Sequence, residues 1–345
     1  MRRLPVFFLL DCSESMVGDK LDKMQEAMNA IATVLRSNPY ALETVYMSVI
    51  AFAGIAKTIA PLTELYSFYS PKLPLGSGTN LGLALDTLMN EIDRTVVKTT
   101  AEQKGDWKPF VFLITDGRST DKTDVAISRW QAKYAKRATL IAISLGRNAD
   151  FALLKKLTEY VIIYEEADKN EYTALIKWIS DSTIAQSKSV GEGVENNPLP
   201  DLDGIALTMI KEPPINADEA CVVLTGRCQK NKKPYLIKYE RSQTKLSAGE
   251  YEVNISYYDL EGAFMIDEEY FRWSHTDLLA AKINTSLLSG VPSCPYCGNH
   301  SAFAACSCGK LTCTSGGKAT CPWCEEKLFF DNEGSGDFDV GRSLG

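Results

Sequence analysis

The spacing of apolar residues divides the chain into two parts. Up to residue 187, short continuous apolar runs alternate with longer segments in which apolar residues recur every three or four positions. Continuous runs are typical of strands buried on both faces, and the periodic segments are typical of amphipathic helices. The alternation predicts an α/β fold with a doubly wound, mainly parallel sheet. The expected strands are 6–10, 44–52, 110–115, 139–145 and 161–164, and the expected helices are 21–35, 81–97, 125–136, 151–160 and 172–187.

The second part has a different period. Short β-type runs, separated by turn residues such as Asp-Leu-Glu-Gly, predict a small antiparallel unit, and 276–288 has a helical pattern. Gly, Asn, Asp and Pro dominate before this unit and predict a linker, while the Gly- and Asp-rich end predicts a flexible tail. The expected organisation is an α/β domain (1–187), a linker (188–219), a β-rich segment (220–290), a cysteine-rich module (291–330) and a tail (331–345).

Polar residues follow two of the predicted strands. Asp11, Ser13 and Ser15 come directly after the first strand, and Asp116 follows the strand at 110–115. Thr79 lies in a Gly-rich turn before a predicted helix. Ligands of open α/β sheets bind at the carboxyl ends of the strands, so these side chains can converge there. Oxygen ligands of this kind suit a hard divalent cation, and the sequence therefore predicts a Mg²⁺ site.

These five residues, in this order and context, resemble the metal-ion-dependent adhesion site of von Willebrand factor A domains. The resemblance covers roughly residues 1–187 and implies that the three hydroxyls bind Mg²⁺ directly and the carboxylates mostly through water. Three neutral hydroxyls leave the ion electron-poor, so we expect an acidic residue of a protein partner to complete its shell. The alternative is a domain that keeps the fold but binds no metal, its polar residues only capping turns and helices.

Seven of the ten cysteines lie between residues 294 and 324, which in a cytosolic chain indicates metal ligation rather than disulfides. Two C-P-x-C knuckles predict one structural zinc site with four thiolates and no open position for catalysis. The ligands of that site are expected to be Cys294, Cys297, Cys321 and Cys324. Candidates for a second zinc ion are Cys306, Cys308, Cys313 and His300. With a single zinc, the three remaining cysteines would be core residues of a hairpin.

The order of the segments, with a zinc-ribbon-like module at the end, resembles the bacterial TerY family over nearly the whole chain. The resemblance implies a protein encoded with a serine/threonine kinase and a type-2C protein phosphatase, in systems linked to tellurite resistance and to stress or phage defence. The protein could itself be a kinase substrate. We expect Ser187, Ser189 and Ser343 to be sterically open to phosphorylation.

Composition limits the location and the partners. The amino-terminal apolar run is shorter than a signal-peptide core, and no other stretch is long enough to span a bilayer. We therefore expect a cytoplasmic protein without a membrane partner. The formal net charge of −7 argues against nucleic-acid binding through the zinc module, which stays as an alternative function.

The function expected from these features is that of a non-enzymatic, Mg²⁺-dependent adaptor. The rival is a metal-dependent phosphatase or hydrolase, because an aspartate after a buried strand also opens phosphotransfer sites. Those sites carry a second carboxylate two residues on, where this chain has Ser13. Nor does the sequence place a His or Lys evidently as a general acid or base.

Overall fold

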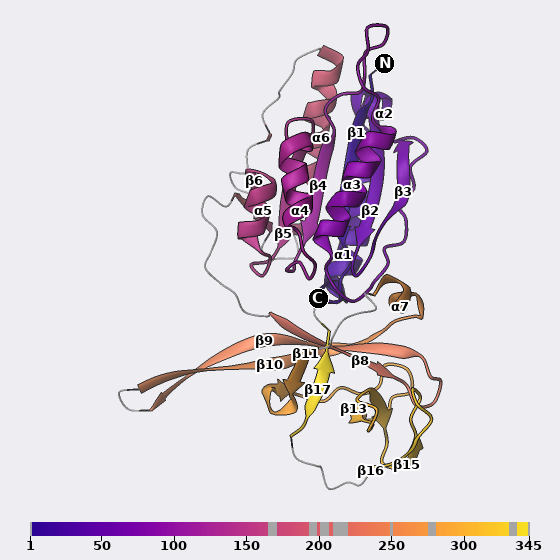
Figure 1. Ribbon diagram of the computed structural model, residues 1–345, viewed down its shortest axis with the longest axis vertical. Coiled ribbons are helices and arrows are strands. Elements are labelled where there is room, and N and C mark those ends of the chain that lie inside the picture. Colours follow the sequence, from indigo (N-terminus) through magenta and orange to yellow (C-terminus); the bar gives the residue numbers. More distant parts are fainter. Residues whose placement is uncertain are drawn as a thin grey trace. The chain divides into compact units, whose positions relative to one another are not determined.

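The computed structural model describes residues 2–164, 171–192, 199–200, 207–209, 220–248, 251–274, 281–330 and 337–343. The chain forms two compact units, one made of Met1–Leu75 with Thr79–Asn216 and the other of Ala217–Gly345 with Gly76–Gly78. Each unit has its own sheet, and each is described by itself (Figure 1).

The first unit is built on a seven-stranded sheet of order β3-β2-β1-β4-β5-β6-β7. Its strands are β1 (Leu4–Asp11), β2 (Val45–Phe52), β3 (Ala56–Glu64), β4 (Phe110–Thr115), β5 (Thr139–Leu145), β6 (Tyr160–Tyr164) and β7 (Leu207–Met209). The five inner strands of the sheet are parallel, namely β2, β1, β4, β5 and β6. The two edge strands, β3 and β7, run antiparallel to their neighbours. The predicted fold class is therefore confirmed. Strand β3 was not predicted from the sequence, because it is a half-exposed edge strand without a continuous apolar run.

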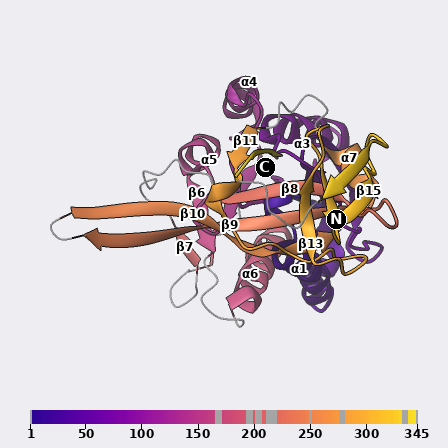
Figure 2. The same cartoon turned by 90° about the horizontal axis from the view of Figure 1, so that it is seen from below.

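Helices cover both faces of this sheet (Figures 1 and 2). They are α1 (Asp19–Arg36), α2 (Pro39–Thr44), α3 (Leu81–Thr95), α4 (Asp124–Arg129), α5 (Phe151–Leu157) and α6 (Glu171–Glu192). Helices α3, α4 and α5 pack on one face, over a core that includes Phe7, Leu9 and Val111. The single helix expected at 125–136 is instead α4 followed by the π-helical turn η2 (Trp130–Tyr134). The wider turn lets the rings of Trp130 and Tyr134 stack at 5.9 Å while both stay buried.

The second unit contains a six-stranded sheet of order β12-β10-β9-β8-β14-β13. Its strands are β8 (Cys221–Arg227), β9 (Pro234–Ala248), β10 (Tyr251–Met265), β12 (Leu288–Ser289), β13 (Ser301–Ala305) and β14 (Leu311–Thr314). Two small ladders add β11 (Ala281–Asn284) with β17 (Asp339–Arg342), and β15 (Gly317–Thr320) with β16 (Lys327–Phe330). The second unit also contains the short helix α7 (Glu269–Trp273) and the 3₁₀ turn η3 (Thr285–Leu287). A further 3₁₀ turn, η1 (Glu14–Met16), belongs to the first unit.

The structure corrects the expected division of the second half. Strand β14, from the cysteine-rich module, pairs in parallel with β8, so 220–290 and 291–330 share one sheet rather than forming successive segments. The helix expected at 276–288 is wrong where the structure describes it, because β11, η3 and β12 occupy 281–289 and residues 275–280 lie outside the described residues. The apolar residues of this segment instead lie in β11, which pairs with β17, and in β12, at the edge of the six-stranded sheet.

The expected linker and tail also contain regular structure. Helix α6 extends to Glu192 and β7 adds an edge strand, while most of 188–219 lies outside the described residues. In the tail, β17 pairs with β11, and Val340 and Arg342 are buried. The Arg342 guanidinium also donates to the Cys221 carbonyl oxygen at 3.1 Å. This short alternating strand was not predicted, because the glycines and aspartates of the tail are typical of irregular segments.

Candidate metal centres

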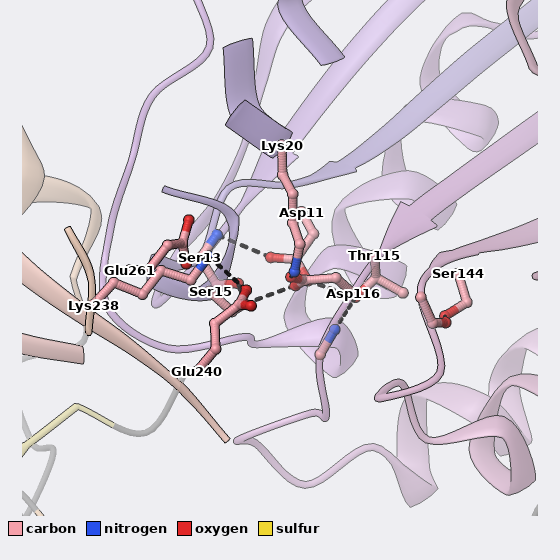
Figure 3. Close-up of polar contacts among 12 residues, drawn as sticks. Asp11, Ser13, Ser15, Lys20, Thr115, Asp116, Ser144, Lys238, Glu240 and Glu261 are labelled. Atoms are coloured by element: carbon pink, nitrogen blue, oxygen red, sulfur yellow. Dashed lines mark hydrogen bonds and ion pairs between the residues drawn. The ribbon is translucent and has the colours of Figure 1, made fainter. Parts of the chain in front are cut away.

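Two neighbouring strands bring the first group of polar residues together. Strands β1 and β4 are parallel and in register, Leu10 lying opposite Ile114, so Asp11 and Asp116 lie at the same carboxyl edge. Ser13 and Ser15 follow in the turn that leads through η1 to α1. All four of these residues are buried. Their side chains face one another in Figure 3.

A chain of short hydrogen bonds connects these side chains. The Ser13 and Ser15 hydroxyls lie 3.0 Å apart, and Ser15 donates to Asp116 Oδ1 at 2.7 Å. Asp11 Oδ1 accepts the Ser13 backbone N–H at 2.9 Å, and Asp11 Oδ2 accepts the Thr115 hydroxyl at 2.5 Å (Figure 3). Thr115 thus orients Asp11, a role that sequence reasoning missed because Thr115 was taken only as the end of a strand.

Thr79 completes the set and provides the test of whether a cation fits. A Cβ built on Gly117 would lie 3.6 Å from both Ser15 Oγ and Thr79 Oγ1, so these hydroxyls point into the same space. Thr79 is 2% exposed, and its hydroxyl has no hydrogen-bond partner among the described residues. A buried hydroxyl without a partner is costly. A divalent cation would give this oxygen a partner, and the three hydroxyls and two carboxylates match its donor preference.

The charges of the site favour a cation. Burial, followed by the neighbouring Asp116 carboxylate, raises the pKa of Asp11 to about 7. Two buried carboxylates this close repel each other when both are ionised, and a bound cation removes that repulsion. The negative charge of these two carboxylates therefore favours a bound cation.

Lys20 neutralises part of this negative charge. Its ammonium, on the first turn of α1, lies 2.6 Å from Asp116 Oδ2, and its side chain is 32% exposed (Figure 3). Sequence analysis did not identify Lys20 as part of this site. The docking of α1 brings Lys20 there, which its sequence separation from Asp116 does not reveal. Paired with a carboxylate, this ammonium supplies charge rather than a free base.

The second half of the chain contains two groups of four cysteines. In each group the four sulfur atoms lie within 4.8 Å of one another. We call Cys228, Cys294, Cys297 and Cys313 the inner group, and Cys306, Cys308, Cys321 and Cys324 the outer group. Representative sulfur pairs are 3.6 Å apart in the inner group and 3.6 and 3.9 Å apart in the outer group. Tetrahedral zinc with Zn–S bonds of about 2.3 Å requires sulfurs about 3.8 Å apart, so both groups fit zinc.

This arrangement differs from the expected pairing of the two knuckles. Cys294 and Cys297 lie with Cys313, whereas Cys321 and Cys324 lie with Cys306 and Cys308. His300 is exposed and belongs to neither group. Each C-P-x-C knuckle still supplies two thiolates to one site, but its partners come from different strands and turns.

Cys228 is the ligand candidate that sequence reasoning missed. It is fully buried in the turn between β8 and β9, far from the cysteine cluster in sequence. The next residue, Gln229, donates its backbone N–H to Cys313 Sγ at 3.2 Å, as expected near a thiolate. The only sequence signal was a cysteine in a polar turn between two β-type runs. Burial raises the pKa of both Cys294 and Cys313, so these thiols bind protons strongly unless a metal displaces them.

The fold and the sites define a protein with an α/β domain whose metal site is built from hydroxyls and carboxylates, followed by a β domain with cysteine metal sites. Comparison with known families gives the same division. The von Willebrand factor type A domain matches residues 6–177, and the TerY-C metal binding domain matches residues 218–345. The chain therefore contains a von Willebrand factor type A domain in its first part and a TerY-C metal binding domain in its second.

Individual relatives are distant. The chain is 24% identical over 165 residues to the human inter-alpha-trypsin inhibitor heavy chain H6, a match that covers 44% of this chain and 12% of that protein. The mussel byssus proximal thread matrix protein 1 is 19% identical, with 53% of this chain and 48% of that one covered and a TM-score of 0.39. A von Willebrand factor type A protein from Catenulispora acidiphila is 14% identical, with 76% and 55% covered and a TM-score of 0.39.

Two expectations about exposure can be compared with the structure. Ser187 is fully buried and its hydroxyl lies 2.9 Å from that of Thr44, while the hydroxyl and N–H of Ser343 both donate to the Val223 carbonyl. The expected openness to a kinase is therefore wrong for Ser187, whereas Ser343 is half-buried, and the side chain of Ser189 lies outside the described residues. None of the described helices has the length and apolar content that crossing a membrane requires.

Proposed function

We propose that this protein is a non-enzymatic adaptor in which Mg²⁺ at the carboxyl edge of the first sheet receives an acidic residue of a protein partner. The observation that carries the proposal is the buried Thr79 hydroxyl, which has no partner among the described residues although four other oxygen-bearing side chains converge beside it. The combination of a von Willebrand factor type A domain with a TerY-C domain supports a metal-dependent interaction protein.

The finer part of the proposal concerns the partners. The resemblance to the TerY family leads us to propose a serine/threonine kinase and a type-2C phosphatase as partners, in cytoplasmic phosphosignalling linked to tellurite resistance and to stress or phage defence. In this scheme the cysteine groups hold zinc and stabilise the second unit, and the metal site of the first unit makes the contact. Co-purification of the full chain with the kinase and phosphatase encoded beside it tests these partners.

The sharpest test of the metal contact is Thr79→Ala. Because this buried hydroxyl makes no hydrogen bond to any described residue, its removal should not lower the melting temperature of the metal-free chain. It should weaken Mg²⁺ binding, measured calorimetrically on the full chain, by at least about tenfold, a typical loss when a metal site is impaired. Partner binding should fall equally, as it should when a chelator is added.

Glu26→Ala is the matched control, since this exposed glutamate on α1 makes no contact at the site. Unchanged Mg²⁺ affinity in Thr79→Ala would contradict the proposed ligand set. If Mg²⁺ binding is lost but partner binding is unchanged, the metal site is not the site that recognises the partner.

The rival hydrolase is weakened by the position of Lys20. A general base must have a free lone pair, and the Lys20 ammonium is paired with Asp116 at 2.6 Å. Neither of the two histidines of the chain, His275 and His300, belongs to the first 187 residues. Phosphate release from phosphopeptides by the purified protein, abolished by Asp11→Asn, would overturn the non-enzymatic assignment.

A further inference from the structure

A second candidate site lies at the opposite edge of the first sheet. A cavity of about 1090 Å³ is lined by residues at the amino-terminal ends of β1, β4, β5 and β6, among them Leu4, Phe110, Leu140 and Tyr160. The metal site occupies the carboxyl ends of β1 and β4, so the two sites share no residue. In Figure 1 this is the end of the first unit at which the N-terminus is marked.

Cationic side chains dominate the lining of this cavity. Seven of them face two carboxylates, Asp106 and Glu159, in a chain whose formal net charge is −7. The cationic residues are Arg2, Lys98, Lys108, Lys136, Arg137, Lys155 and Lys156. The chain thus concentrates positive charge here against its overall balance, which marks a candidate site for an anion.

The two carboxylates leave this charge largely uncompensated. Asp106 binds Arg3 at 2.8 and 2.5 Å and accepts the Val97 N–H at 2.8 Å, so its oxygens are already occupied. Glu159 is exposed and hydrogen-bonds Tyr160, whose pKa is raised by burial and then by this carboxylate. The ammonium groups of four lysines form no ion pair or hydrogen bond with any residue that the structure describes, namely those of Lys98, Lys108, Lys136 and Lys156.

The loop that carries two of these lysines is held in place. Between Val97 and Asp106, the Asp106 N–H donates to the Val97 carbonyl at 2.9 Å, and the Gly105 N–H donates to Thr99 Oγ1 at 3.0 Å. A Cβ on Gly105 would come within 2.4 Å of the Thr99 nitrogen, so only glycine fits there. The lysines thus extend from an ordered loop, which lowers the entropy lost when they bind a ligand.

The same loop is anchored through Trp107. The Arg2 guanidinium lies 4.4 Å from the centre of the indole ring and donates to the Gly105 carbonyl at 2.7 Å. The indole N–H is shielded from solvent and has no acceptor among the described residues. The contacts of Arg2 therefore fix this loop beside the uncompensated lysines, which favour an anion that accepts charge-assisted hydrogen bonds.

We propose that this cavity binds a phosphorylated segment of a protein partner. Its volume of about 1090 Å³ slightly exceeds that of ordinary ligand sites, about 300–1000 Å³, and accommodates a short peptide but not a nucleic-acid duplex. Each phosphate brings about −1.5 to −2 charges, so two phosphates match four uncompensated lysines. A carboxylate peptide brings only one charge per side chain, so at equal length it matches the lysines less well.

The test is charge reversal of the two loop lysines, Lys98→Glu with Lys108→Glu, in the full chain. The control is Lys104→Glu with Lys318→Glu, which changes the net charge equally at exposed lysines that do not line the cavity. The probes are a short peptide with two phosphoserines, the same peptide with glutamates, and a single-stranded oligonucleotide of equal charge. Fluorescence anisotropy reports the affinity of each probe.

We expect the wild-type chain and the control to bind the phosphopeptide alike, and the loop variant to bind it about tenfold more weakly, or about 1.4 kcal/mol. The glutamate peptide should bind more weakly than the phosphopeptide throughout. Absent phosphopeptide binding, equal binding by the two variants, or tighter binding of the oligonucleotide at the same lysines would each overturn the proposal. If the loop variant melts earlier than the control, Lys98→Gln with Lys108→Gln replaces it, and unchanged phosphopeptide affinity in that pair also refutes the site.

Discussion

Replacing Cys228 by serine distinguishes the observed cysteine groups from the pairing expected from sequence. Cys228 is fully buried, and its N–H donates to the Lys233 carbonyl at 2.9 Å within the β8–β9 turn. Serine keeps the size of the side chain but replaces a soft thiolate by a hydroxyl, a poor zinc ligand. If the inner group holds zinc, Cys228→Ser should lower the content from two zinc ions per chain to one.

The expected loss of stability follows from linkage. Metal that binds only the folded state stabilises it by about 4.1 kcal/mol when its concentration is a thousand times the dissociation constant. A thousandfold weaker inner site removes most of that contribution at the same zinc concentration. The effect should appear in the second unit, because the inner group joins the β8–β9 turn to β14 and lies within the apolar core that includes Leu224, Tyr235 and Leu311.

Elemental analysis gives the zinc content, and thermal unfolding with added zinc or chelator gives the linked stability. Cys221→Ser is the matched control, since Cys221 lies at the start of β8 and in neither cysteine group. Two zinc ions in Cys228→Ser, together with loss of the same ion in Cys294→Ser and Cys321→Ser, would refute the observed grouping and restore the sequence-based pairing.

Substitutions at three further charged sites test the remaining electrostatic contacts. Lys20→Met should tighten Mg²⁺ binding by up to about tenfold in calorimetry, since an ammonium no longer competes for the carboxylate; weaker binding would show that Lys20 assists the metal. Hydrogen bonds from Lys133 and Tyr134 hold the pKa of Asp93 at about 2, so its stabilisation is present above about pH 4 and lost as the pH falls towards 2. Asp93→Asn should therefore cost about 1 kcal/mol at neutral pH, allowing for solvent screening, and nothing near pH 2; a constant difference in urea unfolding would contradict this. Lys238, 1% exposed, pairs with Glu261 at 2.7 Å and with Glu240 at 3.7 Å (Figure 3). Because Glu240 stays in place, Glu261→Ala should destabilise by about 2 kcal/mol, less than the loss of a sole buried partner, and Glu261→Ala combined with Lys238→Met should recover most of it in the same assay.

The sheet of the first unit could be predicted from sequence because its central strands are buried on both faces. Strand β1 is apolar up to its last residue, Asp11, and β4 is apolar up to Thr115, which Asp116 follows, so the two acids mark the carboxyl edge. Convergence of Asp11 and Asp116 follows from parallel pairing alone. Edge strands carry no such signal, and β3 and β7 were missed for that reason.

The parts that sequence could not give depend on how distant elements dock. Lys20 reaches Asp116 only because of the placement of α1, and Cys228 joins the inner group only because β14 pairs with β8. Spacing rules identify a C-P-x-C knuckle as half of a zinc site, but they do not say which knuckle or strand supplies the other half.

The cysteines of the two groups alternate along the chain and, if both groups hold zinc, their burial predicts the order in which the ions leave. Cys313 of the inner group lies on β14, between the outer pairs that precede and follow that strand. Three of the inner cysteines are buried, whereas Cys308 and Cys324 of the outer group are exposed. A chelator must reach the ion or await local opening, so release should be biphasic, with the outer ion leaving first. Zinc release followed with a chromogenic chelator should lose its fast phase in Cys308→Ser and its slow phase in Cys228→Ser. A single phase in the wild-type chain would mean that opening of β14 releases both ions together, and that the outer group is no more accessible than the inner one.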